Sequence, residues 1–256
     1  MTAAAVPTPA PTPDPETARA FAERMPDGHA LNSDEPQMET TLHQRQLVLL
    51  ETTLDWCWRE RSDYFLGANL SIYFDHDELR RRRFLGPDFF VVRGVSPEPR
   101  RSWVVWEEGG RYPDLIVELL SDSTATIDRG DKRQHYQNIF RTPEYFWFDP
   151  VHGEFEGLRL GSHRRYEPIP PSAGGLRWSE VLELHLGVTD GVLRYFDADG
   201  ELVPTPPESA LAERERADQA QRLAETERER AEAEHLRAER LAARLRELGI
   251  DPDDGA

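Results

Sequence analysis

The sequence of 256 residues has little cysteine, little lysine and no long apolar run. Its single cysteine, Cys57, cannot form a disulfide within the chain, which excludes a disulfide-rich scaffold. No stretch approaches the roughly 18 consecutive apolar residues that a membrane-spanning helix needs. The first residues also lack the basic start and apolar run of a secretory signal. We therefore expect a cytoplasmic protein without a membrane partner.

Positive charge is scarce as well. The formal net charge is −17, and residues 39–207 alone hold 28 acidic against 20 basic side chains, or −8. This balance argues against a protein that holds nucleic acid through a broad basic surface. Any contact with DNA must use a local basic patch, with metal ions offsetting the negative field. Arg81, Arg82 and Arg83 form the best such patch in the linear sequence, and the alternative for this run is a solvated turn.

The composition divides the chain into segments. Residues 1–37 are rich in Pro, Thr and Ala and predict a disordered extension, and residues 251–256 predict a disordered tail. One domain is expected at residues 38–205. Residues 206–250 predict a long charged helix, in which Ala and Leu recur at alternating spacings of three and four residues. This seam predicts a homodimer formed through residues 210–248. The alternative is a single solvated helix stabilised by i,i+4 pairs of Glu and Arg.

Hydrophobic periodicity within residues 38–205 predicts a mixed α/β fold. Leu42, Leu47, Leu50, Leu54 and Trp58 recur at helical spacing and predict a helix over residues 39–60. Aromatic and β-branched residues predict strands at 64–74, 88–92, 102–107 and 113–120. A helix over 128–140 and a strand over 144–149 follow, which indicates a crossover unit inside a mixed sheet. The shorter segments up to residue 205 predict a peripheral layer of hairpins.

An acidic residue interrupts the apolar strand PDLIVELL. The period of two puts Asp114 and Glu118 on one face, where a carboxylate is costly to bury unless it is paired or bound to metal. These two residues lie roughly 13 Å apart along a strand, too far to share one Mg²⁺. Asp88, at the entry of the strand at 88–92, is the candidate partner for Glu118 on a neighbouring strand. The alternatives are a Glu118 paired with an arginine and an Asp88 that ends a turn after Pro87.

Lys132 is the only lysine, in a chain that otherwise uses arginine for its positive charge. An ammonium is a compact donor whose pKa shifts readily on burial, whereas a guanidinium is always protonated. An amine that is kept once is therefore a candidate for stabilising charge on a phosphate. The alternative is a solvent-facing charge on the helix.

Four segments in fixed order, GPDFFVV, PDLIVELLSDST, DRGDKRQHYQ and TPEYFWFDP, resemble the Uma-two family of restriction endonucleases, within the PD-(D/E)XK nuclease superfamily. The resemblance covers roughly residues 38–205. It implies a restriction-endonuclease-like mixed β-sheet core flanked by helices, and hydrolysis of DNA phosphodiesters with Mg²⁺ or Mn²⁺. It also implies that Asp88, Glu118 and the backbone carbonyl of Leu119 hold the metal.

The chain departs from the superfamily pattern at one position. Leu120 stands where the motif has lysine, and Lys132 is similar in position to a lysine that the family carries on the following helix. Tyr136 follows one turn later on the same face and could hydrogen-bond a phosphate or the lysine. Glu39 and His43, four residues apart on the first helix, are accessory candidates, with an ordinary helix surface as the alternative.

Two functions follow from these residues. The first is a metal-dependent endonuclease in which Asp88 and Glu118 hold the metal and Lys132 assists catalysis. The second is a nuclease-fold interaction module without catalysis, which assembles through its C-terminal helix. A separation of more than about 8 Å between Lys132 and both carboxylates would favour the module, because that gap exceeds the reach of one bridging water.

Overall fold

The computed structural model describes residues 14–25, 27–28, 31–34, 40–75, 84–121 and 128–247. Two candidate groups, Glu39 and the run Arg81, Arg82 and Arg83, lie outside the described residues. The chain forms two compact units, residues 1–205 and residues 206–256. The first contains all the strands that the structure describes, and the described part of the second is one long helix.

A six-stranded mixed sheet forms the centre of the first unit. Its strand order is β1-β3-β5-β6-β7-β8. The bounds are Tyr64–Ala68, Phe89–Arg93, Leu115–Leu119, Glu144–Phe148, Phe155–Leu160 and Tyr166–Pro168. Strands β5 and β6 are parallel, and the other neighbours are antiparallel. The mixed sheet and the placement of the strands at 88–92 and 113–120 side by side are as the sequence predicts.

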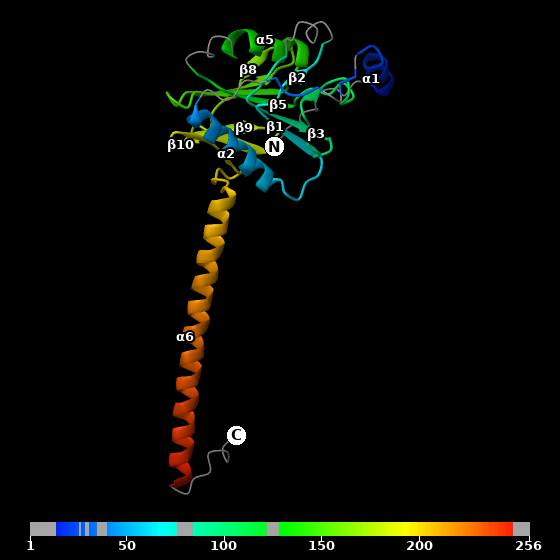
Figure 1. Cartoon of the computed structure of the whole chain (residues 1–256). Coiled ribbons are helices and arrows are strands. Elements are labelled where there is room, and N and C mark those ends of the chain that lie inside the picture. Colours follow the sequence, from blue (N-terminus) through cyan, green and yellow to red (C-terminus); the bar gives the residue numbers. More distant parts are fainter. Residues whose placement is uncertain are drawn as a thin grey trace. The chain divides into compact units, whose positions relative to one another are not determined.

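The crossover between β5 and β6 is the predicted helix over residues 128–140. It consists of the wide π-type turns η1 (Asp128–Lys132) and η2 (Tyr136–Phe140) around the short α5 (Arg133–His135). In Figure 1 this helix lies on one side of the main sheet, and helix α2 (Thr41–Cys57) lies on the other. The two helices therefore cover opposite faces of the same strands.

Alternation along the central strands fills two cores. Phe89 and Val117 point toward α2, where they pack with Leu50 and Leu54. The intervening residues, such as Ile116, pack on the other face against the crossover helix and its Tyr136 and Phe140. Because both faces are covered, these strands read as almost continuous apolar runs. The predicted buried face of the first helix is confirmed except at Leu42, which is 39% exposed.

The strands after β6 do not form the peripheral layer that the sequence suggested. Strands β7 and β8 extend the main sheet. A second sheet, in the order β11-β10-β9, is made from Val192–Phe196, Leu184–Thr189 and Arg177–Ser179. Leu184, Leu186, Leu193 and Tyr195 from this sheet join the core beneath α2. Their alternation buries one face of the small sheet, and that face completes the main core.

Part of the segment expected to be disordered is ordered. Helix α1 (Pro15–Ala22) begins after Asp14, whose carboxylate caps it. Ala22, Met25 and Leu31 then pack on a cluster that includes Tyr73, near the two-stranded sheet of β2 (Ile72–Tyr73) and β4 (Trp103–Val104). The prediction of disorder is therefore wrong for these residues. A few spaced apolar side chains are enough to order this segment once they can pack on another part of the protein. Composition alone does not reveal that such a surface exists.

Helix α6 spans Pro206–Glu247 and has no buried residue. The predicted long charged helix is therefore confirmed, and self-association through residues 210–248 stays a prediction. Within the described ranges, none of the helices has both the length and the apolar character required to cross a bilayer.

Candidate active site

The strand register brings the two candidate carboxylates together. Strand β3 pairs with β5 so that Phe89 lies opposite Val117, and Asp88 directly precedes Phe89 while Glu118 directly follows Val117. The Leu119 backbone N–H donates to Asp88 Oδ2 at 2.6 Å. The Asp88 carboxylate is thus fixed at the end of β5, next to the residue that carries the second acid.

Glu118 is fully buried and is held by two donors from the crossover helix. The Tyr136 hydroxyl donates to Oε1 at 2.7 Å, and Lys132 Nζ donates to Oε2 at 3.3 Å. Lys132 Nζ also donates to the Gly86 carbonyl at 3.0 Å. Burying a carboxylate is costly unless charge and hydrogen bonds compensate for the lost water. Lys132 and Tyr136 supply that compensation at one point of the sheet.

The spacing of four residues explains why one helix can serve the site twice. Lys132, Tyr136 and Phe140 follow each other at this interval, and Tyr136 and Phe140 are buried against the sheet. Leu120, at the position of the missing motif lysine, is buried and apolar. The cation at the end of β5 therefore comes from the helix. Tyr136 contacts the carboxylate of Glu118, a partner that sequence reasoning did not assign to it.

His43 supports the same strand end from α2. Its side chain is buried, Nε2 lies 3.0 Å from the Leu120 carbonyl, and Nδ1 lies 2.7 Å from the Thr40 hydroxyl. A carbonyl oxygen only accepts, so Nε2 carries the proton of this bond. Thr40 also caps α2 by accepting from the His43 backbone N–H. His43 therefore fixes the residue that directly follows the candidate metal-binding segment Glu118–Leu119.

The donor set at this site suits Mg²⁺ or Mn²⁺. Within the part of the chain that the structure describes, no three His, Cys, Asp or Glu side chains gather as a metal cluster. Two carboxylates are nevertheless enough for Mg²⁺, which binds through one or two carboxylates, keeps several waters and takes further oxygens from substrate phosphates. Each oxygen of a carboxylate has two lone pairs, so a hydrogen bond to Lys132 or Tyr136 leaves acceptor capacity on Glu118.

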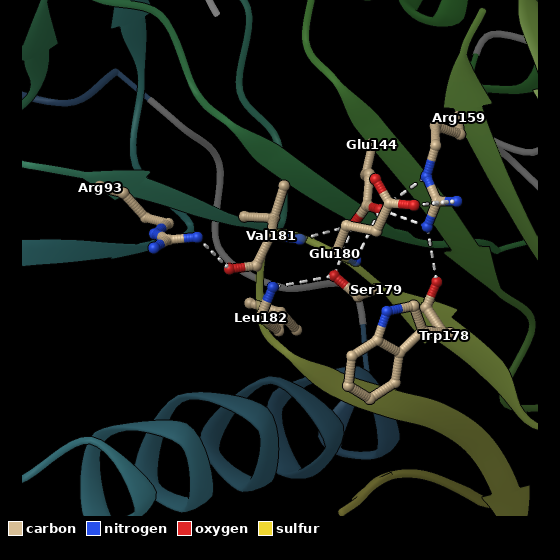
Figure 2. Close-up of polar contacts among 8 residues, drawn as sticks. All are labelled: Arg93, Glu144, Arg159, Trp178, Ser179, Glu180, Val181 and Leu182. Carbon is tan, nitrogen blue, oxygen red and sulfur yellow. Dashed lines mark hydrogen bonds and ion pairs between the residues drawn. The ribbon is translucent and has the colours of Figure 1, made fainter. Parts of the chain in front are cut away.

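A second buried carboxylate has a different environment (Figure 2). Glu144 is the first residue of β6 and lies at the opposite end of the parallel pair from Glu118. Arg159 donates to its Oε1 from Nε at 3.0 Å and from Nη2 at 2.8 Å, and the Glu180 backbone N–H donates at 2.9 Å. The Ser179 hydroxyl donates to the other oxygen. These donors come from β7, from β9 and from the residue after β9, so Glu144 joins the two sheets and has a structural role.

Asp114 is also part of the framework. The Arg93 backbone N–H donates to Asp114 Oδ2 at 2.7 Å. Burial raises the pKa of Asp114, while this hydrogen bond and the nearby charges of Arg111 and Arg93 oppose the rise. The sequence argument that Asp114 and Glu118 cannot share a metal agrees with this arrangement, because Asp114 precedes the start of β5 and Glu118 lies near its end.

The mixed sheet, with a helix on each face and two carboxylates at neighbouring strand ends, is a restriction-endonuclease-like fold. A family model described as “Uma2: Putative restriction endonuclease” matches residues 22–194, and the chain belongs to this family. The match includes every described residue of the site. It also begins earlier than the roughly residue 38 that the motifs indicated.

One similar solved structure is described as the crystal structure of a “putative nuclease belonging to DUF820” from Anabaena variabilis. The two chains are 16% identical, and the alignment covers 61% of this chain and 83% of that chain, with a TM-score of 0.46. Among curated proteins, none matches.

Proposed function

We propose that the protein is a metal-dependent endonuclease that hydrolyses DNA phosphodiester bonds at the end of β5. Family membership supports the nuclease class. The observation that carries the proposal is the 3.3 Å contact between Lys132 Nζ and the buried Glu118 carboxylate. A buried acid next to a second acid, with the only lysine of the chain at hydrogen-bonding distance, is a set of groups suited to phosphoryl chemistry.

Asp88, Glu118 and the Leu119 carbonyl would hold Mg²⁺ or Mn²⁺. When bound, the ion supplies Lewis-acid activation of a water and neutralises charge on the phosphate. The protein contributes a rigid set of ligands. The Leu119 N–H orients Asp88, and the Tyr136 hydroxyl orients Glu118.

Lys132 is proposed to stabilise the negative charge that develops on the phosphate. Its ammonium carries three donors, and the Gly86 carbonyl and Glu118 fix its position. A donor that is already oriented needs no rearrangement when the charge appears, which is the main source of such stabilisation. The side chain of Lys132 is 23% exposed, so the ammonium can also reach a substrate.

The alternative of a non-catalytic interaction module is less well supported. The separation of 3.3 Å lies well inside the limit of about 8 Å beyond which the module would be favoured. The long helix α6 fits either function, since a nuclease can also self-associate through it.

Cleavage by the full-length protein tests the proposal. Plasmid, linear duplex and single-stranded DNA are incubated with Mg²⁺, with Mn²⁺ or with EDTA, and the products are separated on gels. We expect cleavage of at least one substrate with a metal ion and none with EDTA. Glu118→Gln and Asp88→Asn should abolish cleavage while the circular dichroism spectrum is retained. Folded wild-type protein that leaves all three substrates intact with both metals would contradict the proposal.

A further inference from the structure

A polar groove runs between the crossover helix and the turn that joins β7 to β8. It has a volume of about 780 Å³. The helix contributes Arg133 and Gln137 to its lining, and the turn contributes Arg164 and Arg165. We call it the arginine groove. Its two walls lie about thirty residues apart in the sequence, so no linear basic run indicates it.

The charge of the arginine groove is opposite to that of the protein as a whole. Three arginines and His163 line it, and among the described residues no carboxylate does, although the chain carries a formal charge of −17. Asp131 and Glu167 flank these segments in sequence, and neither lines the groove. The groove is thus a local basic patch of the kind that an acidic DNA-binding protein requires.

The arginines of the groove are not engaged within the described part of the protein. Arg133, Arg164 and Arg165 make no side-chain hydrogen bond or ion pair there. In contrast, Arg159 of the same domain is bound to Glu144 and to Glu180. The guanidinium groups of the groove can therefore bind an external anion without breaking a hydrogen bond or ion pair to another described residue.

The walls of the groove are held together. The Tyr166 backbone N–H donates to Gln137 Oε1 at 2.8 Å, and the Tyr166 hydroxyl donates to the Thr142 carbonyl at 3.0 Å. The turn itself is closed by the Gly161 N–H, which donates to the Arg165 carbonyl at 2.9 Å. The arginines therefore extend from a prearranged frame, which lowers the entropy lost on binding.

The arginine groove and the candidate active site share one helix. Lys132 and Tyr136 hold Glu118, while the residues directly after them, Arg133 and Gln137, line the groove. The two sites thus occupy neighbouring faces of the same two turns. A strand that lies in the groove would pass beside the helix that carries the catalytic cation.

We propose that the arginine groove binds the sugar-phosphate backbone of the DNA substrate, with Arg133, Arg164 and Arg165 contacting phosphates. This inference rests on the proposed function, since it names the surface that delivers DNA to that site. Its volume lies in the ~300–1,000 Å³ range of pockets for drug-sized ligands, so it accommodates a short stretch of nucleotides and more than one phosphate. Guanidinium groups bind phosphate in bidentate fashion, and such contacts set the position of DNA and not its sequence preference.

The test uses a matched pair of variants. Arg164 and Arg141 both have a left-handed backbone, with φ of 57° and 54°, and only Arg164 lines the groove. Replacing either by glycine removes one charge and relieves the same backbone strain, so both variants should fold. Arg164→Gly and Arg141→Gly are compared with wild type in EDTA, where we expect no cleavage, by fluorescence anisotropy with labelled duplex DNA.

Binding is measured between about 50 and 200 mM salt, because each phosphate contact contributes about 0.9 to the slope of log K against log salt concentration. We expect Arg164→Gly to bind more weakly and to reduce the slope by about one contact, whereas Arg141→Gly keeps the wild-type slope. The double variant Arg133→Gln, Arg165→Gln should reduce the slope by about two contacts. Thermal denaturation confirms that each variant is folded.

The outcomes separate the two proposals. Wild-type affinity and slope in Arg164→Gly and in the double variant would overturn the groove even if the wild-type protein cleaves DNA, and so would a wild-type protein that binds no DNA. Binding that depends on the groove arginines, in a protein that cleaves nothing with Mg²⁺ or Mn²⁺, would support the groove and contradict the proposed catalysis.

Discussion

Lys132 Nζ lies 3.3 Å from Glu118 Oε2, so the only lysine of the chain contacts the one fully buried glutamate of the central strand. Strand β5 carries Glu118 and the crossover helix carries Lys132, so the contact forms only when these two segments pack together. The pair places a carboxylate oxygen and a cation together at the end of β5. Five predictions follow from this relationship and from the framework that surrounds it.

Lys132 and Glu118 should be coupled in stability. Lys132→Met leaves the Glu118 carboxylate buried without this cation, and the free energy of unfolding in EDTA should fall by about 1–3 kcal/mol. Adding Glu118→Gln removes the buried charge and should restore part of the loss, with a coupling energy of about 0.5–3 kcal/mol. Urea denaturation of the wild type, both single variants and the double variant gives the cycle. Losses that simply add would show that the pair is not coupled.

Lysine and arginine at position 132 should also support different rates of cleavage. Lys132→Met is expected to lower the cleavage rate about 100-fold or more, as expected when one oriented donor to a developing oxyanion is lost. Lys132→Arg keeps the charge but changes the shape of the donor, so we expect only partial activity. The measurement is single-turnover cleavage at saturating Mg²⁺. An unchanged rate in Lys132→Met would remove the lysine from the mechanism.

His43 is predicted to act as a positioning residue, because it holds the Leu120 carbonyl and does not contact the candidate ligands through any described hydrogen bond. His43→Ala should raise the Mg²⁺ concentration for half-maximal cleavage by about 10- to 100-fold, as is typical when a group that orients metal ligands is lost. His43→Asn retains a side-chain N–H and should recover part of the metal affinity. A fall in stability with an unchanged Mg²⁺ dependence would show a purely structural role.

The two buried glutamates should have different roles, Glu118 in cleavage and Glu144 in the stability of the fold. Glu144→Gln weakens the junction with Arg159 and should lower the free energy of unfolding by about 2 kcal/mol, while the folded fraction still cleaves DNA. Glu118→Gln should abolish cleavage. The cleavage rate of each variant is divided by its folded fraction at the same temperature, and this normalised activity distinguishes a loss of stability from a loss of catalysis. Loss of normalised activity in Glu144→Gln would place this residue in the catalytic machinery.

The buried carboxyl group of Asp114 should make the free energy of unfolding depend on pH. Burial raises its pKa in the folded state above the ordinary value of 3.8, so the folded protein binds this proton more tightly than the unfolded chain does. Stability from this group is therefore complete below pH 3.8 and is lost as the pH rises through the folded-state pKa. Asp114→Asn, which can still accept from the Arg93 N–H, should be more stable than wild type at pH 7, with a gap that closes toward pH 4. Urea denaturation across this range measures the gap, and a gap independent of pH would contradict the assignment.

Much of the framework could be predicted from local patterns. The apolar runs around residues 88–92, 113–120 and 144–149 encode buried strands, because covered strands need no polar alternation. The switch to helical spacing after residue 128 predicts the crossover. The order of the segments then makes Asp88 and Glu118 neighbours, and the pairing of β3 with β5 agrees.

The sequence by itself therefore determined the central strands and the crossover helix, because these features depend on periodicity within single segments. The pairing of β3 with β5 then placed the two acids at neighbouring strand ends. Only the tertiary structure decided that Tyr136 binds Glu118, that the Gly86 carbonyl holds Lys132, and that Ala22, Met25 and Leu31 pack on the domain. It also assembled the arginine groove from a helix and a distant turn. Each of these contacts joins segments far apart in the chain, and their geometry is set by the packing of the whole core and not by any local pattern.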